Sequence, residues 1–287
     1  TSVSSGFLWN EEQAASDEPS ENREMGEPSI WDVGPEDTGE SMMEAPAASG
    51  GASVEELLEG LNPAQKEATE WVEGALLILA GAGSGKTRVI THRIAHLVRT
   101  GAARPHEILA ITFTNKAAKE MRERVERLVP EKGLWISTFH SMCARILRRE
   151  IGVLSGFNRD FTIYDTSDKN QLVKTILKSM NYDTKRFRPG MVSGWISEWK
   201  NTSWAEAGTH SDDGQIQGYE DEVLVRTRQR YDETMRQNNA LDFDDLLIRT
   251  LEIFEQHPGV RDQYARRFRF VLVDEYQDTN RIQYRLT

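Results

Sequence analysis

The sequence predicts an α/β protein with a parallel sheet covered by helices on both faces and split by a mostly helical inserted subdomain. Short apolar runs alternate with helical patterns between residues 75 and 149, and the alternation lapses from about residue 150 to 238. A last apolar run follows at residues 268–273. Alternating strands and helices are typical of parallel sheets whose two faces are both buried.

The individual elements follow from residue periodicity. Residues 75–80 form an apolar run that we expect to be a buried strand, followed by a glycine-rich loop and a helix. Residues 108–113 and 134–139 resemble strands in the same way, each with a helical pattern after it. Residues 268–273 supply the last strand. Asp242, Asp244 and Asp245 could suggest a metal site, but acids at a helix start favoured by the helix dipole explain them better.

Composition excludes a membrane protein or a secreted one. The chain contains no run of eighteen apolar residues, and its acidic start lacks the basic region of a secretory signal. Its one cysteine, Cys143, cannot form an internal disulfide, which fits a reducing compartment. We therefore expect a cytoplasmic protein with no membrane partner.

The net charge of −11 belongs to the N-terminal tail. Residues 1–54 hold twelve acids and one base, Arg23, so the remainder of the chain is neutral and could bind nucleic acid. Residues 1–52 lack any sustained period and are expected to be disordered. Their Phe7-Leu8-Trp9 segment is either a scattered aromatic cluster or a docking motif for a protein partner of the acidic tail.

The loop after the first apolar run has the pattern of a phosphate-binding loop. Its glycines let several backbone N–H groups face one anion, and a helix N-terminus follows. Lys86 could reach the β- and γ-phosphates of ATP, and the Thr87 hydroxyl could bind Mg²⁺. Ala80 occupies the first position, where glycine is usual. A flexible glycine turn is the alternative. The loop candidates for cofactor binding are Ala80, Gly81, Ala82, Gly83, Ser84, Gly85, Lys86 and Thr87.

Two acids, Asp274 and Glu275, follow the last apolar run. Ligands of open α/β sheets bind beyond the carboxyl ends of the strands, where these acids would lie. Asp274 would hold Mg²⁺, and Glu275 would orient and deprotonate the attacking water. A solvated turn is the alternative interpretation.

Several segments in this order resemble the motifs of the UvrD/PcrA/Rep-type superfamily 1 DNA helicases. The resemblance covers roughly residues 56–287 and rests on residues 61–65, 80–87, 112–118, 138–141, 241–247 and 274–280. It implies an ATP-dependent DNA helicase that moves 3′ to 5′, acts in repair or replication, and binds single-stranded DNA and single-strand/duplex junctions. ATP and Mg²⁺ would be its cofactors.

The resemblance assigns further nucleotide-site residues. It implies that Gln65 reads the adenine edge, although glutamine at this position could equally complete a helix capping box. Arg88 would lie near the nucleotide, or would be an ordinary surface residue. Gln277 would link the nucleotide site to the DNA site, or would be a polar turn residue.

The DNA path is implied by Phe113, Thr114, Asn115 and His140. An aromatic ring offers a sequence-independent stacking platform, while hydroxyl, amide and imidazole groups hold phosphates. The alternatives are a last core residue for Phe113 and a capped or buried histidine for His140.

The predicted organisation has four parts: a tail at 1–52, a first motor segment at 53–149, the helical insertion at 150–238 and a second motor segment at 239–287. The family takes its arginine fingers from a second motor domain, so we expect residues 1–287 to be an N-terminal fragment with little activity alone. The alternatives are a non-catalytic short form that senses nucleotide and binds DNA or protein, and the helicase part of a RecB/AddA-type helicase–nuclease.

Overall fold

The computed structural model describes residues 53–81, 83–207 and 218–287. The expected tail at 1–52 and the loop residue Ala82 lie outside the described residues. Within those residues, no helix combines the length and the apolar character needed to cross a membrane.

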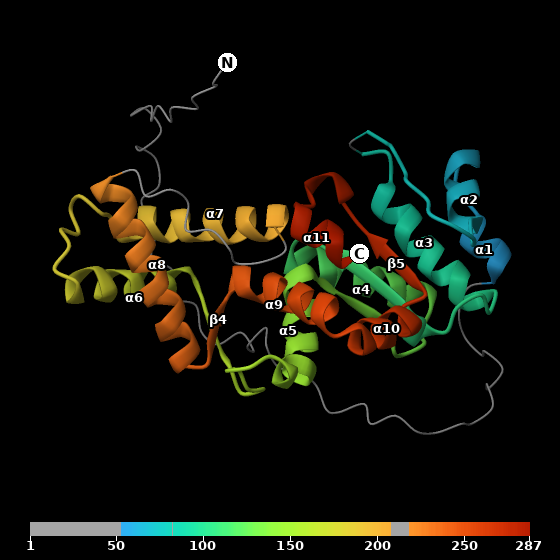
Figure 1. The fold of residues 1–287 in the computed structure, drawn as a ribbon. Helices are drawn as coiled ribbons and strands as arrows, with labels where there is room; N and C mark the ends of the chain where they lie inside the picture. The colour runs from blue at the N-terminus through green and yellow to red at the C-terminus, as the bar shows by residue number, and fades with distance from the viewer. Residues whose placement is uncertain (1–52, 82, 208–217) are drawn as a thin grey trace, which may run out of the picture. The chain divides into compact units, whose positions relative to one another are not determined.

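A three-stranded parallel sheet forms the centre of the motor segments, in the order β2-β1-β5 (Figure 1). The register sets Thr112 opposite Thr138 and Ile111 opposite Val273, so the carboxyl ends of all three strands meet at one edge. The strands are β1 (Ile108–Thr112), β2 (Trp135–Thr138) and β5 (Phe270–Val273).

Helices bury the sheet from both faces. All five residues of β1 are buried, which requires cover on both sides. On one face, side chains of α3 (Lys86–Arg99) and α4 (Asn115–Leu128) form a single core with the strands. The packed residues of this core include Ile94, Leu97, Met121, Val125, Ala110, Ile136 and Leu272. The predicted α/β class with a parallel sheet is confirmed.

The prediction of a buried strand at residues 75–80 is wrong. This run has no strand assignment, and Leu77 and Leu79 are 65 % and 86 % exposed. Among the described residues, only β1 pairs with β5, so the run gains no ladder partner in this sheet. An apolar pattern predicts burial, but a strand also needs a neighbour for its N–H and C=O groups.

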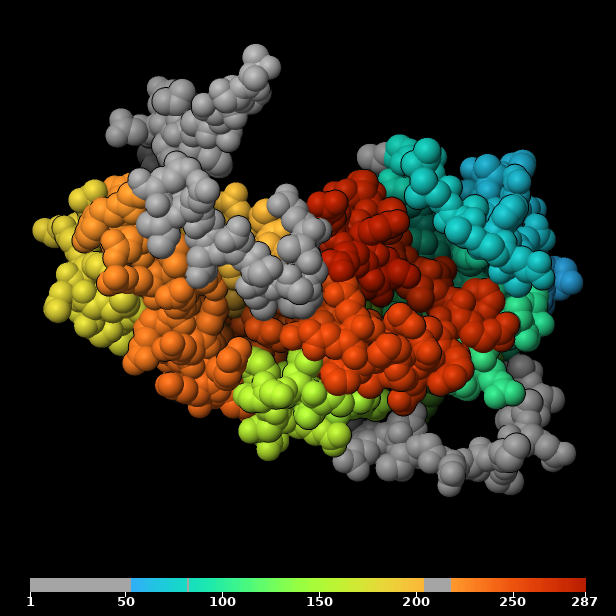
Figure 2. Space-filling view, viewed as in Figure 1, coloured from blue at the N-terminus to red at the C-terminus, as the bar shows by residue number. Residues whose placement is uncertain are grey.

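Between α5 (Phe139–Glu150) and α9 (Phe243–Gln256) the chain forms three long helices with a core of their own. They are α6 (Thr166–Ser179), α7 (Pro189–Ala207) and α8 (Tyr219–Gln237). Two short parallel strands, β3 (Thr162–Tyr164) and β4 (Ala240–Asp242), also pair here, which the sequence did not predict. In Figure 2 the surfaces of α8, α9 and α10 adjoin one another above α5.

The remaining elements surround this framework and include short 3₁₀ turns. They are α1 (Val54–Leu58), α2 (Pro63–Glu70), η2 (Pro105–Glu107), η3 (Ile151–Val153), α10 (Pro258–Arg267), η4 (Tyr276–Asp278) and α11 (Arg281–Leu286).

A buried ion network joins the three-helix segment to α9. Lys200 of α7 lies 3.0 Å from Asp242 Oδ2 and 2.8 Å from Asp245 Oδ1, and all three side chains are at most 6 % exposed. The Tyr231 hydroxyl of α8 donates to Asp242 Oδ2 at 2.9 Å. Asp242 also caps α9 by accepting from the Asp245 N–H, which confirms the predicted helix start.

Burial disfavours the charged form of Lys200, but the attraction of the two carboxylates is stronger than this effect. Desolvation alone would lower the pKa of Lys200, yet Asp242 and Asp245 raise it above its usual value. The ammonium therefore stays charged inside the protein.

Candidate functional site

The phosphate loop ends where α3 begins. Gly83 and Gly85 adopt left-handed backbone angles, with φ of 75° and 88°, and Gly85 caps the helix. Lys86 Nζ donates to the carbonyl oxygens of Ala80 and Gly81 at 3.1 and 3.3 Å. The Ser84 hydroxyl donates to the same Gly81 oxygen at 2.7 Å. The lysine thus rests on the carbonyls of its own loop, and any ligand phosphate would have to replace those bonds.

The Thr87 hydroxyl and the Asp274 carboxylate meet beside this loop. Thr87 Oγ1 donates to Asp274 Oδ2 at 3.4 Å. The Asp274 N–H continues the sheet by donating to the Ile111 oxygen at 2.9 Å. Burial and the adjacent Glu275 raise the pKa of Asp274, which a nearby cation would reverse. Hydroxyl and carboxylate oxygens are donors that Mg²⁺ accepts together with substrate phosphates, so these residues fit the expected ion.

Glu275 occupies a strained backbone position. Its φ of 50° and ψ of 45° are left-handed, a conformation that costs a non-glycine residue about 1–2 kcal/mol. Its N–H donates to Asp274 Oδ1 at 3.1 Å, and Gln277 Nε2 donates to its carboxylate at 2.6 Å. Gln277 therefore contacts the carboxylate of Glu275 and is itself exposed within the 3₁₀ turn η4.

Gln65 completes a helix capping box and also contacts the phosphate loop. It completes a capping box at the start of α2, with the Asn62 N–H donating to Gln65 Oε1 at 3.0 Å. Its Nε2 also donates to the Ser84 oxygen of the phosphate loop at 3.0 Å. Arg88 is exposed on α3, with its guanidinium near Gly60.

The expected DNA residues lie at the carboxyl ends of β1 and β2. The Phe113 ring packs edge-on against Phe139 at 5.8 Å between centroids, so it is partly a core residue. Thr114 caps α4, where its hydroxyl accepts from the Ala117 N–H at 3.1 Å. Asn115 is exposed at the first position of that helix.

His140 is paired with an aromatic residue that the sequence interpretation did not single out. The ring of Phe243 lies edge-on to the imidazole at 5.9 Å and is 37 % exposed. Burial lowers the pKa of His140, and Asp244 opposes this effect in part. The sequence did contain a signal for Phe243. It is an apolar residue between aspartates at a helix start, where a solvated turn would carry polar residues.

The candidate nucleotide-site residues and the candidate DNA-path residues lie at the same edge of the sheet. Asp274 and Phe113 both directly follow strands that are neighbours in the sheet, and His140 follows β2 by two residues. A phosphate loop at a helix start and an acid at a strand end define a P-loop α/β protein.

The comparisons with known proteins agree with this class. A family model described as "UvrD/REP helicase N-terminal domain" matches residues 61–287, and the chain belongs to that family of DNA helicases. It is 49 % identical over 233 residues to the ATP-dependent DNA helicase PcrA of Bacillus subtilis. It is 47 % identical over 232 residues to that of Staphylococcus aureus and 48 % over 233 to that of Staphylococcus epidermidis. Each match covers 80 % of this chain and 31 % of the relative, so the chain spans about a third of their length.

Proposed function

We propose that this chain carries the nucleotide site of an ATP-dependent DNA helicase that moves 3′ to 5′ along single-stranded DNA, engages single-strand/duplex junctions and serves repair or replication. The observation that supports it is the shared sheet edge. Asp274, the candidate metal ligand, bonds through its N–H to Ile111, two residues before the candidate DNA contact Phe113. A shift at the nucleotide site can therefore reach the DNA surface through one hydrogen-bonded strand pair.

The nucleotide roles follow from the contacts. Lys86 would leave its loop carbonyls to bind the β- and γ-phosphates, and the backbone N–H groups of the loop glycines Gly81, Gly83 and Gly85 would bind the same anion. Thr87 and Asp274 would hold Mg²⁺, which supplies charge neutralisation at the phosphates when bound. Glu275, held by Gln277, would orient and deprotonate the attacking water.

The DNA roles belong to Phe113, Thr114, Asn115, His140 and Phe243. The partly exposed rings offer stacking surfaces, and the Asn115 amide offers a phosphate contact. This combination binds single strands without reading their sequence, as a translocating protein requires.

The organisation is part of the proposal. Residues 53–149 and 239–287 would form one motor domain, and 150–238 the insertion within it. Because the chain spans 31 % of its PcrA relatives, we propose that a second motor domain lies elsewhere in a longer protein, cytoplasmic in location, whose acidic tail binds a protein partner.

A binding experiment tests the coupling. Purified chain is titrated with a fluorescent single-stranded oligonucleotide, with and without a non-hydrolysable ATP analogue and Mg²⁺. We expect the analogue to change DNA affinity, and DNA to change analogue affinity by the same factor. Lys86→Ala should lose nucleotide binding and keep DNA binding, while the exposed control Lys132→Ala should behave as the parent chain. Unaltered nucleotide binding by Lys86→Ala would overturn the site.

Hydrolysis provides a second test. In our proposal the arginines that face the phosphate loop come from the second motor domain, so the chain alone should show little DNA-stimulated ATPase activity. A rate on the order of tens per second would refute the proposed second domain. In the longer protein, Lys86→Ala and Glu275→Gln should abolish unwinding and leave DNA binding intact. Unwinding of duplexes with only a 5′ tail would refute the direction.

A further inference from the structure

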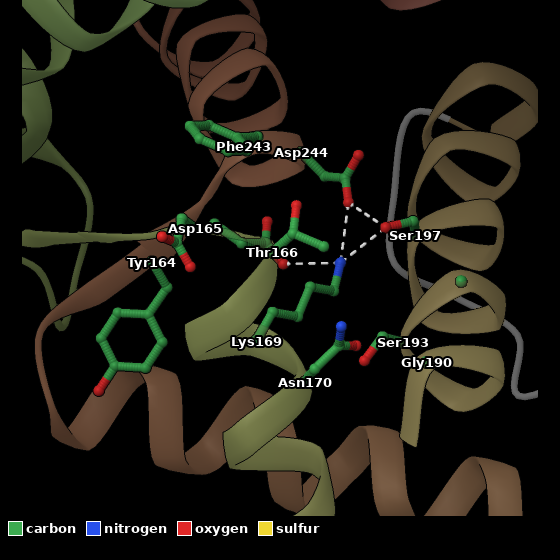
Figure 3. Close-up of a pocket in the computed structure, with 12 residues that line it drawn as sticks. Tyr164, Asp165, Thr166, Lys169, Asn170, Gly190, Ser193, Ser197, Phe243 and Asp244 are labelled. Carbon is green, nitrogen blue, oxygen red and sulfur yellow. Dashed lines mark hydrogen bonds and ion pairs between the residues drawn. The ribbon is translucent and has the colours of Figure 1, made fainter. Parts of the chain in front are cut away.

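Two lysines of this chain are hydrogen-bonded in different ways. In the cavity of about 330 Å³ between α6, α7 and the start of α9, Lys169 Nζ lies 2.6 Å from Ser197 Oγ and 3.0 Å from Asp244 Oδ2 (Figure 3). Its charge is therefore matched by a carboxylate. Lys86 instead donates to neutral carbonyl oxygens of its own loop. An anion therefore gains more from meeting Lys86 than from meeting Lys169.

The phosphate loop is bonded to itself at Gly81. The Gly81 oxygen accepts from Lys86 Nζ at 3.3 Å, from the Ser84 hydroxyl at 2.7 Å and from the Ser84 N–H at 3.3 Å. A phosphate-binding loop holds its anion through backbone N–H groups that face the ligand. Because the Ser84 N–H is directed at Gly81 instead, the loop must rearrange at Ser84 before this group can face a phosphate.

Gln65 of α2 bonds the same serine through its carbonyl group. Its Nε2 donates to the Ser84 oxygen at 3.0 Å. Nε2 also lies 3.0 Å from the position that a Cβ on Gly85 would take, so the amide packs closely against the loop where α3 begins. Within the part of the chain that the structure describes, no other hydrogen bond joins residues 81–85 to an element other than α3. Gln65 is thus the outside contact that opposes a rearrangement at Ser84.

The two partners of the Gln65 amide define its orientation. Oε1 is the atom that accepts from the Asn62 N–H, and Nε2 is the atom that donates to the Ser84 oxygen. Adenine presents a ring nitrogen that accepts beside an amino group that donates, and a glutamine amide matches this pattern with the same two atoms. A bound adenine would therefore compete with the Ser84 oxygen for Nε2.

We propose that Gln65 is a positioning residue that restrains the phosphate loop in its self-bonded form, and that adenine releases this restraint by taking Nε2 from the Ser84 oxygen. A triphosphate without a base must break the Gln65–Ser84 bond without replacing it, whereas ATP replaces that bond with its own. This inference rests on the proposed ATP site and deepens it, because it makes phosphate binding depend on recognition of the base.

Three variants isolate the restraint. Gln65→Met keeps a long side chain and removes both polar atoms of the amide, and Gln65→Ala removes the side chain beyond Cβ. Asn62→Ala is the matched control. It removes the other half of the same capping box, the bond from the Gln65 N–H to Asn62 Oδ1 at 2.9 Å, and leaves the Gln65 amide in place.

Calorimetric titration measures the affinity of each protein for inorganic tripolyphosphate and for a non-hydrolysable ATP analogue, both with Mg²⁺. We expect tripolyphosphate to bind the two Gln65 variants about threefold to tenfold more tightly than the parent chain, the worth of one hydrogen bond between neutral groups. The ATP analogue should bind these variants no more tightly than the parent chain, because the restraint and the adenine contact are lost together. Asn62→Ala should bind both ligands as the parent chain does.

The outcomes separate the restraint from the nucleotide site. If tripolyphosphate binds both Gln65 variants no more tightly than it binds the parent chain, the restraint is wrong and the proposed ATP site stands. An equal gain in Asn62→Ala would assign the effect to the start of α2 and would also overturn the restraint. If the parent chain binds neither ligand, the proposed function fails and the restraint fails with it.

Discussion

Thr87 and Asp274 are 187 residues apart in sequence, and their side chains meet at 3.4 Å. The threonine belongs to the first turn of α3, and the aspartate directly follows β5. The whole three-helix segment α6–α8 lies between these two residues in the sequence, yet their side chains are in contact. A hydroxyl and a carboxylate are oxygen groups of the kind that Mg²⁺ accepts as ligands, which is why we propose these two residues to hold the ion.

Thr87→Val should separate metal binding from folding. The substitution keeps the shape of the side chain and removes one oxygen, so affinity for Mg²⁺ with nucleotide should fall about tenfold or more, equivalent to ~1.4 kcal/mol. Calorimetric titration with Mg²⁺ and an ATP analogue measures it. Thr100→Val, at the exposed C-terminal end of the same helix, is the control and should leave the affinity unchanged.

The Glu275→Gly variant should be more stable to unfolding than the Glu275→Ala variant. Both substitutions remove the carboxylate, but only glycine accepts φ of 50° without cost, so Glu275→Gly should exceed Glu275→Ala by about 1 kcal/mol in free energy of unfolding. Urea denaturation measures the difference. At the exposed helical residue Glu126 the order should reverse by a similar amount, because glycine weakens a helix interior. Equal stabilities at position 275 would show that its backbone carries no strain.

Lys200→Met should destabilise the chain far more than the loss of a surface ion pair. Removal of the ammonium takes away the ion-pair partner of the buried Asp245 and leaves the buried Asp242 with Lys169 alone, which costs about 3–5 kcal/mol. Arg186→Met, which breaks the exposed pair with Glu220 at 2.9 Å, should cost about 0–1 kcal/mol. Thermal and urea unfolding of both variants give the comparison. A loss below about 1 kcal/mol at Lys200 would contradict a tightly paired network.

His140 should make stability depend on pH. Burial lowers its pKa below the usual 6.5, so the folded chain takes up this proton only at a lower pH than the unfolded chain does. Stability from this group is therefore fully present above pH 6.5 and is lost as the pH falls toward the lowered value. The advantage of the parent chain over His140→Gln in free energy of unfolding should shrink as the pH drops through this window. Parallel pH curves for the two proteins would disprove it.

Local signals in the sequence were sufficient for much of the fold. Thr114 and Asp242 begin helices because their side chains accept from the N–H three residues on, and that pattern is legible from residue types alone. The phosphate-loop pattern and the acid pair were likewise recognisable, and the structure brings the Thr87 hydroxyl to the Asp274 carboxylate; the metal site itself stays a prediction.

Long-range relationships were out of reach. Residues 75–80 have the composition of a buried strand, but strand formation depends on a neighbour that an apolar pattern does not specify. Lys200 resembled an ordinary polar helix residue, because its two carboxylate partners lie more than forty positions later. The pairing of Phe243 with His140 is visible only in the structure, because the two residues lie about a hundred positions apart in the sequence.

Asp242 ends β4 and caps α9, and the same carboxylate holds Lys200 and Lys169. Strand, helix and two lysine-bearing helices therefore share one fixed point. A swing of α6 and α7 about this junction would have to separate buried charges, which is costly. The ion pairs of Asp242 therefore oppose any movement of α6 and α7 relative to α9. We expect a hinge that changes the shape of this protein during a working cycle to lie elsewhere in the chain.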